Sequence, residues 1–212
     1  MRLLVFDFDG TIANTEEAIM LTISQTLKQL GRSIPPENHI RSYIGLPLAR
    51  IFEEICGTKD SSFISEAVRI YRARFPANCK STTSLYPGVR ETLNDLRAKG
   101  ISLAIASSRE RHSLLSLAEQ LGIRSDFSII AGEQDVSRHK PEPDIANFVL
   151  EQTHISPANA MFIGDTVFDI RAGNAAGMKT CGVSYGNHTR SQLVEAGADY
   201  VIDRFPELLD II

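Results

Sequence analysis

The feature that most constrains the fold of this chain is the alternation of short apolar runs with segments of helical periodicity. Six runs have the length of a buried strand and lack regular polar alternation: Leu3–Phe6, Ile101–Ala106, Phe127–Ala131, Ala160–Ile163, Thr180–Val183 and Tyr200–Ile202. Apolar residues between them recur every three or four positions, as in Val89–Leu96, Leu114–Leu121 and Ile145–Val149. Continuous apolar strands are typical of a parallel sheet covered on both faces. We therefore predict an α/β fold with a doubly wound parallel sheet.

One stretch departs from this alternation, because no strand is recognisable between about Asn14 and Thr83. Three helical patterns lie there instead: Ile19–Leu30, Leu48–Cys56 and Phe63–Tyr71. A crossover between parallel strands normally needs only one helix. We therefore predict an inserted α-helical cap over residues 14–83 and a core domain made of residues 1–13 and 84–212.

Prolines mark the C-terminal end of this insertion. The chain is expected to return to the core through Pro76–Leu85, and Pro87-Gly88 is expected to begin the next helix.

The charges differ between the two predicted parts. Residues 14–83 contain nine Lys or Arg and seven Asp or Glu, a balance of +2, whereas the whole chain has 22 basic and 26 acidic residues, a net charge of −4. The remainder therefore carries −6. A slightly basic cap over an acidic core suits an anionic substrate. The negative total argues against a protein that binds nucleic acid through phosphate contacts.

Other features bound the setting in which the protein works. No apolar run approaches the roughly 18 residues of a membrane span, so we expect no membrane partner. The three cysteines, Cys56, Cys79 and Cys181, form no CxxC pair, which indicates free thiols in a reducing compartment and hence a cytoplasmic protein. Nothing in the sequence decides between a monomer and a dimer.

Two acidic pairs follow apolar runs. The first is in Asp7-Phe8-Asp9-Gly10-Thr11, where Gly10 allows a tight turn, and the second is in Gly164-Asp165-Thr166-Val167-Phe168-Asp169. Ligands of an open α/β sheet bind at the carboxyl ends of its strands. If the two strands are neighbours, up to four carboxylates converge, and two charges 4 Å apart repel by about 4 kcal/mol at an effective dielectric of 20. Such a cluster needs a cation, and oxygen ligands favour Mg²⁺ over zinc.

Outside these pairs, Ser107 and Lys140 are further candidates for the site, whereas the histidines are not. Ser107 follows the run Ser102–Ala106, where its hydroxyl and backbone N–H can hold a phosphate oxygen. Lys140 lies in Arg138-His139-Lys140-Pro141-Glu142-Pro143-Asp144, and Pro143 suits the first turn of a helix. The histidines show no metal-binding spacing and are expected on the surface or in loops: His39, His112, His139, His154 and His188.

Taken together, these motifs resemble those of the haloacid dehalogenase superfamily, and in particular its phosphoglycolate-phosphatase-like branch. The matching pieces occur in the family's order and span about 160 residues: Asp7–Thr11, Ser107, Lys140-Pro141 and Gly164-Asp165 with Asp169. The predicted cap resembles that family's helical cap, and Ile44-Gly45-Leu46-Pro47-Leu48 resembles its cap loop in phosphoglycolate-type members. About 30 residues between Ser107 and Lys140 leave no room for the larger cap of other branches.

The resemblance implies a role for each motif residue. Asp7 would be the nucleophile that forms an aspartyl-phosphate, and Asp9 would protonate the leaving alkoxide and then deprotonate the attacking water. Asp7, the backbone carbonyl of Asp9 and Asp165 would bind Mg²⁺, while Asp169 would support the metal or Lys140. The phosphoryl group and substrate would be bound by residues of three motifs: Gly10, Thr11, Ser107, Ser108 and Lys140.

The function that this implies is a Mg²⁺-dependent phosphatase acting on a small phosphorylated metabolite. Phosphoglycolate, sugar phosphates, nucleotides and pyrophosphate all fit the motifs. Dehalogenases of this fold lack an acid at the position of Asp9, so the presence of Asp9 argues against a dehalogenase. Phosphonatases need a Schiff-base lysine in the cap. The lysines of the insertion, which are Lys28, Lys59 and Lys80, do not have a recognisable setting for that role, and this argues against a phosphonatase.

Two alternatives remain. The first is a phosphomutase resembling β-phosphoglucomutase, in which Arg41, Arg50 or Lys80 would hold a sugar bisphosphate. The second is a receiver-like switch that is phosphorylated without turnover. The helical insertion and the second acid argue against the receiver.

Overall fold

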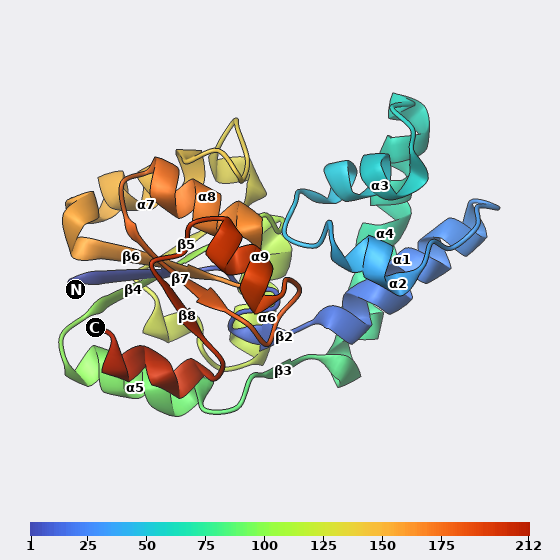
Figure 1. Cartoon of the computed structure of the whole chain (residues 1–212). Helices are drawn as coiled ribbons and strands as arrows, with labels where there is room; N and C mark the ends of the chain where they lie inside the picture. The colour runs from blue at the N-terminus through green and yellow to red at the C-terminus, as the bar shows by residue number, and fades with distance from the viewer.

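The centre of the molecule is a parallel β-sheet, seen in the computed structural model, which describes all residues from Met1 to Ile212 (Figure 1). The strand order is β5-β4-β1-β6-β7-β8, and every neighbouring pair is parallel. The strands have these bounds: β1 Leu3–Phe6, β4 Ser102–Ala106, β5 Ile129–Ala131, β6 Ala160–Gly164, β7 Lys179–Val183 and β8 Tyr200–Ile202. The predicted doubly wound α/β fold is confirmed.

Helices cover both faces of this sheet, which explains why its strands are continuously apolar. Leu4 and Phe6 of β1 are in one buried cluster with Leu93 of α5, whereas Leu3 and Val5 are in a second cluster on the other face. The helices have these bounds: α5 Val89–Ala98, α6 Arg111–Gln120, α7 Asp144–Thr153, α8 Val167–Ala175 and α9 Arg190–Glu195, with 3₁₀ turns at Arg124–Asp126, Glu133–Asp135, Pro157–Asn159 and Phe205–Asp210. Gly88 caps the start of α5, as expected.

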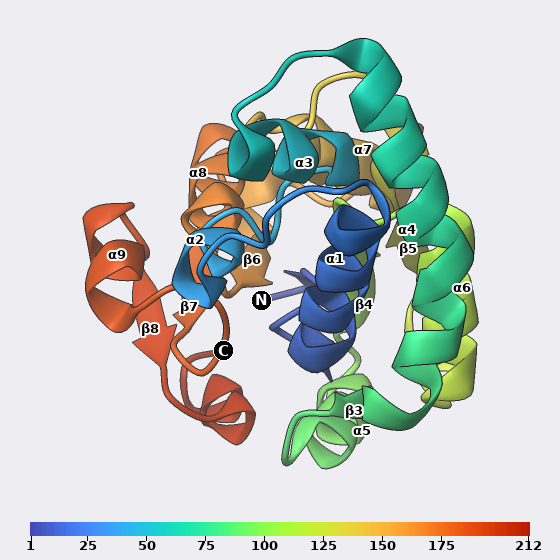
Figure 2. The same ribbon diagram turned by 90° about the vertical axis from the view of Figure 1, so that its right-hand side faces the viewer.

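The remaining helices lie beyond the end of the sheet where β1 ends (Figures 1 and 2). They are α1 Glu16–Gln29, α2 Glu37–Arg41, α3 Leu48–Cys56 and α4 Ser61–Thr82. We keep the name cap for residues 14–83. The short strands β2 (Ala13–Asn14) and β3 (Ser84–Leu85) pair in antiparallel fashion and join the cap to the rest of the chain. Asn14 is therefore in a strand, which the sequence pattern did not indicate.

Helix α4 is longer than the sequence predicts. The chain was expected to leave the cap from Pro76 onward, but α4 continues through Pro76 to Thr82. Packing against α1 stabilises this last part, because Asn78 donates to Thr22 Oγ1 (2.9 Å) and Gln25 Oε1 (3.0 Å). A proline breaks a helix when only local preference decides, and tertiary contacts outweigh that preference here.

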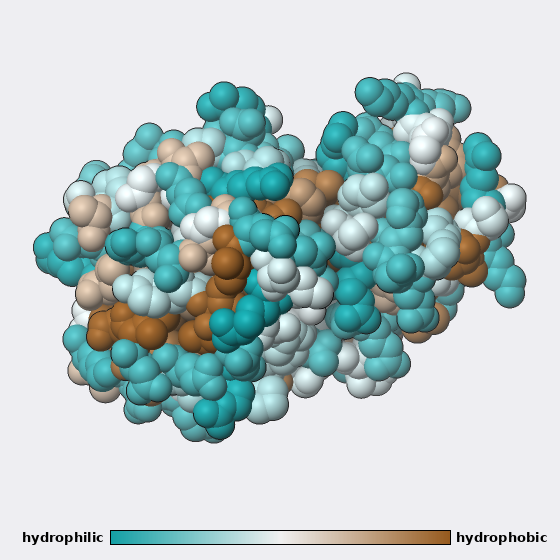
Figure 3. Space-filling model, in the orientation of Figure 1, coloured by the Kyte–Doolittle hydropathy of each residue, from teal (hydrophilic) through white to brown (hydrophobic).

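The outer surface is mostly hydrophilic on the face seen in Figure 3, with apolar side chains gathered over the sheet-bearing part at the left. None of the helices combines the length and the apolar character that crossing a bilayer requires.

Candidate active site

The site lies where β1 and β6 end side by side. Asp7 follows β1, and Asp165 and Asp169 follow β6, with carboxylate oxygens that all lie within 4.8 Å of one another. All three side chains are buried. The parallel register of the two strands brings these motifs together, although about 160 residues separate them in the sequence. The fourth predicted carboxylate, Asp9, does not join this cluster.

Lys140 supplies the positive charge of the cluster. Its Nζ donates to Asp7 Oδ1 at 2.7 Å and to Asp169 Oδ1 at 2.6 Å, and the side chain is only 1% exposed. Burial lowers the pKa of Lys140, but the charges of Asp169 and Asp7 outweigh burial and raise the pKa above its usual value. Lys140 is therefore a cation held between two carboxylates.

The carboxylates carry more negative charge than Lys140 balances. Burial raises the pKa of Asp7 well above its usual value, although Lys140 lowers it in part. Burial and the charge of Asp169 raise the pKa of Asp165 to about 7, against hydrogen bonds that lower it. Three carboxylates with one ammonium group leave a site that is short of positive charge, with only oxygen donors. This donor set fits Mg²⁺.

Asp165 is held in place by groups from two other loops. Thr11 Oγ1 donates to its Oδ1 (3.1 Å), and both the backbone N–H (2.8 Å) and the side-chain amide (2.7 Å) of Asn187 donate to its Oδ2. Gly10 has a φ of +86°, and a Cβ at this position would lie 2.2 Å from Asp165 Oδ2. The loop after β1 can therefore approach Asp165 only with glycine at this position.

Asp9 points away from the cluster and forms an ion pair with Arg109. Arg109 donates from Nε to Asp9 Oδ2 (2.8 Å) and from Nη2 to Asp9 Oδ1 (2.7 Å), and Thr15 Oγ1 also donates to Oδ1 (2.6 Å). The guanidinium lies 4.3 Å from the centre of the Phe75 ring of α4 and donates to Ser113 Oγ at 3.1 Å. Both oxygens of Asp9 are thus occupied by protein donors.

Ser107 and Ser108 line a cavity of about 220 Å³ between the sheet and the cap. Ser107 is buried, and its backbone N–H donates to Ala131 O (3.1 Å). Ser108 Oγ is buried and has no hydrogen-bond partner in the protein. A buried hydroxyl without a partner is costly unless a ligand satisfies it. Ser108 is therefore a candidate donor to a bound substrate.

The cavity brings the motif residues and the cap together. Asp7 and Asp9 line it beside the two serines, and Ile44, Gly45 and Leu46 of the cap loop lie on its wall. The other motif residues lie behind this wall, bonded to one another or to Asp7: Thr11, Lys140, Asp165 and Asp169.

Comparisons with known proteins agree with this geometry. The sequence profile of the family described as haloacid dehalogenase-like hydrolase matches residues 4–183. The chain belongs to this family.

Two curated relatives of this haloacid dehalogenase-like hydrolase are similar over most of their length. A phosphoglycolate phosphatase of Aquifex aeolicus is 31% identical over 88% of this chain and 86% of its own. A pyrophosphatase of Anoxybacillus flavithermus is 29% identical over 99% and 95%. The solved structure of a haloacid dehalogenase-like family hydrolase from Streptococcus pneumoniae has a TM-score of 0.87, at 27% identity over 100% of this chain and 98% of that one. The expected family and an enzyme of the hydrolase type are thereby confirmed.

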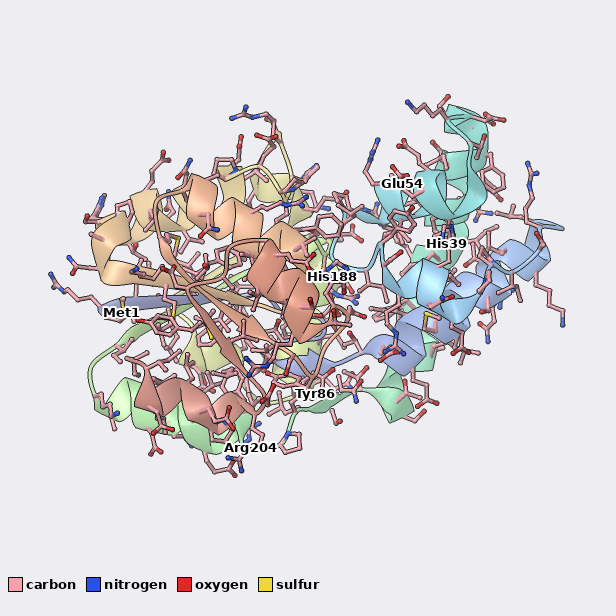
Figure 4. The ribbon with its side chains drawn as sticks, viewed as in Figure 1. Met1, His39, Glu54, Tyr86, His188 and Arg204 are labelled. Carbon is pink, nitrogen blue, oxygen red and sulfur yellow. The ribbon has the colours of Figure 1, made fainter.

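His188 of this haloacid dehalogenase-like hydrolase lies in a loop, as expected, but its side chain is buried, which the sequence did not indicate. Its Nδ1 accepts from Val167 N–H (3.1 Å), and its Nε2 lies 3.3 Å from Ser42 O of the cap. His188 therefore connects the two parts at their junction (Figure 4).

Two further site residues carried no recognisable motif in the sequence. Arg109 stands two positions after Ser107, at the same strand end, and that position is the one signal that could have found it. Asn187 lies in the loop between β7 and α9, whose residues alone did not indicate a contact with Asp165.

Proposed function

We propose that this chain is a Mg²⁺-dependent phosphatase that hydrolyses a small phosphorylated metabolite through an aspartyl-phosphate on Asp7. The main support for the proposal is the buried cluster of Asp7, Asp165 and Asp169, in which Lys140 bonds Asp7 and Asp169 and Asp7 lines the cavity. A carboxylate nucleophile of this kind needs no base, and its main obstacle is repulsion from the anionic phosphate. Lys140 offsets part of that repulsion.

The proposed reaction assigns a role to each residue of the site. Asp7 attacks the phosphorus, and Ser107, with Ser108 as a further donor, binds the phosphoryl oxygens at the end of β4. Asp7, Asp165 and the backbone carbonyl of Asp9 would hold the metal, while Asp169 orients Lys140 at 2.6 Å. Bound Mg²⁺ would neutralise charge on the phosphoryl group and the carboxylates.

Asp9 protonates the leaving oxygen and later takes the proton of the attacking water. Its carboxylate is bonded to Arg109 and Thr15 in the present arrangement. Oδ2 accepts only one hydrogen bond, so it can also bond the leaving group while Arg109 and Thr15 orient the carboxylate. Thr15 lies at the start of α1, so a residue of the cap helps to orient Asp9.

We also propose a domain division and a cellular compartment for this protein. Residues 14–83 act as a cap domain over a core of residues 1–13 and 84–212. The three cysteines are all free, which favours work in the cytoplasm.

The experiment is a measurement of inorganic phosphate released from phosphoglycolate, pyrophosphate, a nucleoside monophosphate and sugar phosphates, with Mg²⁺ and with EDTA. Release that needs Mg²⁺ and is lost in Asp7→Asn supports the proposal. Transfer of labelled phosphate to an isomeric sugar phosphate would instead identify a mutase, and a stable phosphoprotein without phosphate release would identify a switch.

A further inference from the structure

The cavity beside the phosphate site has an unusual balance of charge. Two arginines line it, Arg72 from α4 and Arg109 from the loop after β4, and both are already paired with carboxylates. Arg109 holds Asp9 through two hydrogen bonds. Arg72 approaches Glu110 (Nε to Oε2, 3.1 Å) and Glu133 (Nη2 to Oε2, 3.2 Å).

The two groups differ in what they offer to a ligand. The Asp9–Arg109 pair is neutral, whereas Arg72 with Glu110 and Glu133 carries a net charge of −1. Helix α4 lies beside the start of α6, so this triad closes one side of the cavity (Figure 2). The part of the cavity wall that Arg72, Glu110 and Glu133 form is therefore negative, although the cap as a whole is slightly basic.

A second anion on the substrate would meet no lysine and no arginine that is free of a carboxylate partner in this lining. It would have to take Arg109 from Asp9, whose side chain is only 12% exposed, or Arg72 from two glutamates. The first exchange leaves the mostly buried Asp9 carboxylate without its partner, and the second leaves the partly exposed Glu110 and Glu133 facing the new anion. Like charges brought together in an interface disfavour binding.

Apart from Asp7 and His112, the remaining wall has no Asp, Glu, Lys, Arg or His. The cap contributes apolar side chains, among them Ile19, Ile51 and Phe75, and the opposite wall contributes the hydroxyls of Ser108, Ser113 and Ser116. Ser108 Oγ is buried and unpartnered, so it can bond a hydroxyl or a phosphoryl oxygen. The volume of about 220 Å³ lies below the range of roughly 300–1,000 Å³ usual for ligand pockets, which favours a small leaving group.

We propose that the leaving group is a small uncharged alcohol that bears hydroxyls, as in a polyol or sugar monophosphate, and that Glu110 and Glu133 exclude a second anion by holding Arg72. This inference rests on the proposed phosphatase function and narrows its substrate class. It places phosphoglycolate and pyrophosphate, which carry a second anionic group, among the poor substrates.

The test compares two substrates of similar size, 2-hydroxyethyl phosphate and phosphoglycolate. The first has a neutral hydroxymethyl group where the second has a carboxylate. We expect kcat/KM of the wild-type enzyme with Mg²⁺ to be about tenfold or more higher for 2-hydroxyethyl phosphate. In the double variant Glu110→Gln/Glu133→Gln, Arg72 is free to bind a carboxylate, and this preference is expected to fall about tenfold.

The matched control is Glu66→Gln, which removes a glutamate paired with Arg69 on the exposed side of α4, outside the cavity wall. It should leave the preference between the two substrates at its wild-type value. A wild-type preference for phosphoglycolate, or a preference that the double variant leaves unchanged, would overturn the inference while phosphate release still supports a phosphatase. No release from either substrate or from p-nitrophenyl phosphate would overturn the proposed function itself, and the inference with it.

Discussion

Replacing Lys140 with methionine tests the charge balance at the centre of the site. Methionine has a similar length but no charge, so Lys140→Met leaves Asp7, Asp165 and Asp169 without the protein's own cation. Lys140 Nζ lies 2.7 Å from Asp7 and 2.6 Å from Asp169. At an effective dielectric of 20, each contact contributes about 6 kcal/mol of attraction before the cost of burying the charges. Removing one partner of a buried pair typically destabilises a protein by about 3–5 kcal/mol.

We therefore expect Lys140→Met to lower the free energy of unfolding by about 3–5 kcal/mol, measured by urea denaturation in EDTA. The second change Asp169→Asn removes one of the uncompensated charges, and asparagine can still accept the hydrogen bond that Asp169 receives from Thr166 N–H (3.0 Å). The double variant should thus be more stable than Lys140→Met alone. Equal stability of Lys140→Met and wild type, or strictly additive losses of unfolding free energy in the double variant, would show that Lys140 and Asp169 do not stabilise each other as a buried pair.

Three other changes probe single residues of the site. Asp9→Asn should lower kcat by about 10²–10⁴-fold, because the general acid is lost, and it should also destabilise the fold, because the buried Arg109 guanidinium loses its partner charge; a near-wild-type kcat would contradict the role of Asp9 as general acid. Gly10→Ala should abolish phosphate release and destabilise the fold, because its Cβ would lie 2.2 Å from Asp165. The control is Gly31→Ala, where φ is +65° but no atom lies within 4 Å of the added Cβ. It should lower the free energy of unfolding, measured by urea denaturation, by only about 1–2 kcal/mol. Arg109→Gln should lower the free energy of unfolding by about 3 kcal/mol in the wild-type background and by less in the Asp9→Asn background. Equal losses in the two backgrounds would show that Arg109 and Asp9 do not interact.

The sequence predicts the part of the site that strand ends determine. The runs before Asp7 and Asp165 are apolar on both sides of each strand, because helices cover both faces of the sheet. Such runs predict buried parallel strands, and acidic residues directly after them predict a ligand site at the sheet edge. The six strands accordingly lie within two residues of their predicted positions.

The contacts that the sequence did not predict depend on partners that are distant in the chain. Arg109 and Asp9 are 100 residues apart, and His188 and Ser42 are 146 apart, so neither pair leaves a local pattern. The direction of Asp9 has the same origin. Its position after β1 suggests a place in the acidic cluster, but Arg109 and Thr15 hold it toward the cap. The continuation of α4 through Pro76 likewise depends on its packing against α1.

The central claim is that Asp7 becomes phosphorylated during turnover. The direct measurement is mass spectrometry of peptides from enzyme that is quenched in acid during turnover of a phosphate ester with Mg²⁺, for the wild type and for Asp7→Asn. We expect one added phosphoryl group on the peptide that contains Asp7 in the wild type, and none in Asp7→Asn, which should also release no phosphate. A phosphoryl group on another residue, or continued phosphate release by Asp7→Asn, would contradict it.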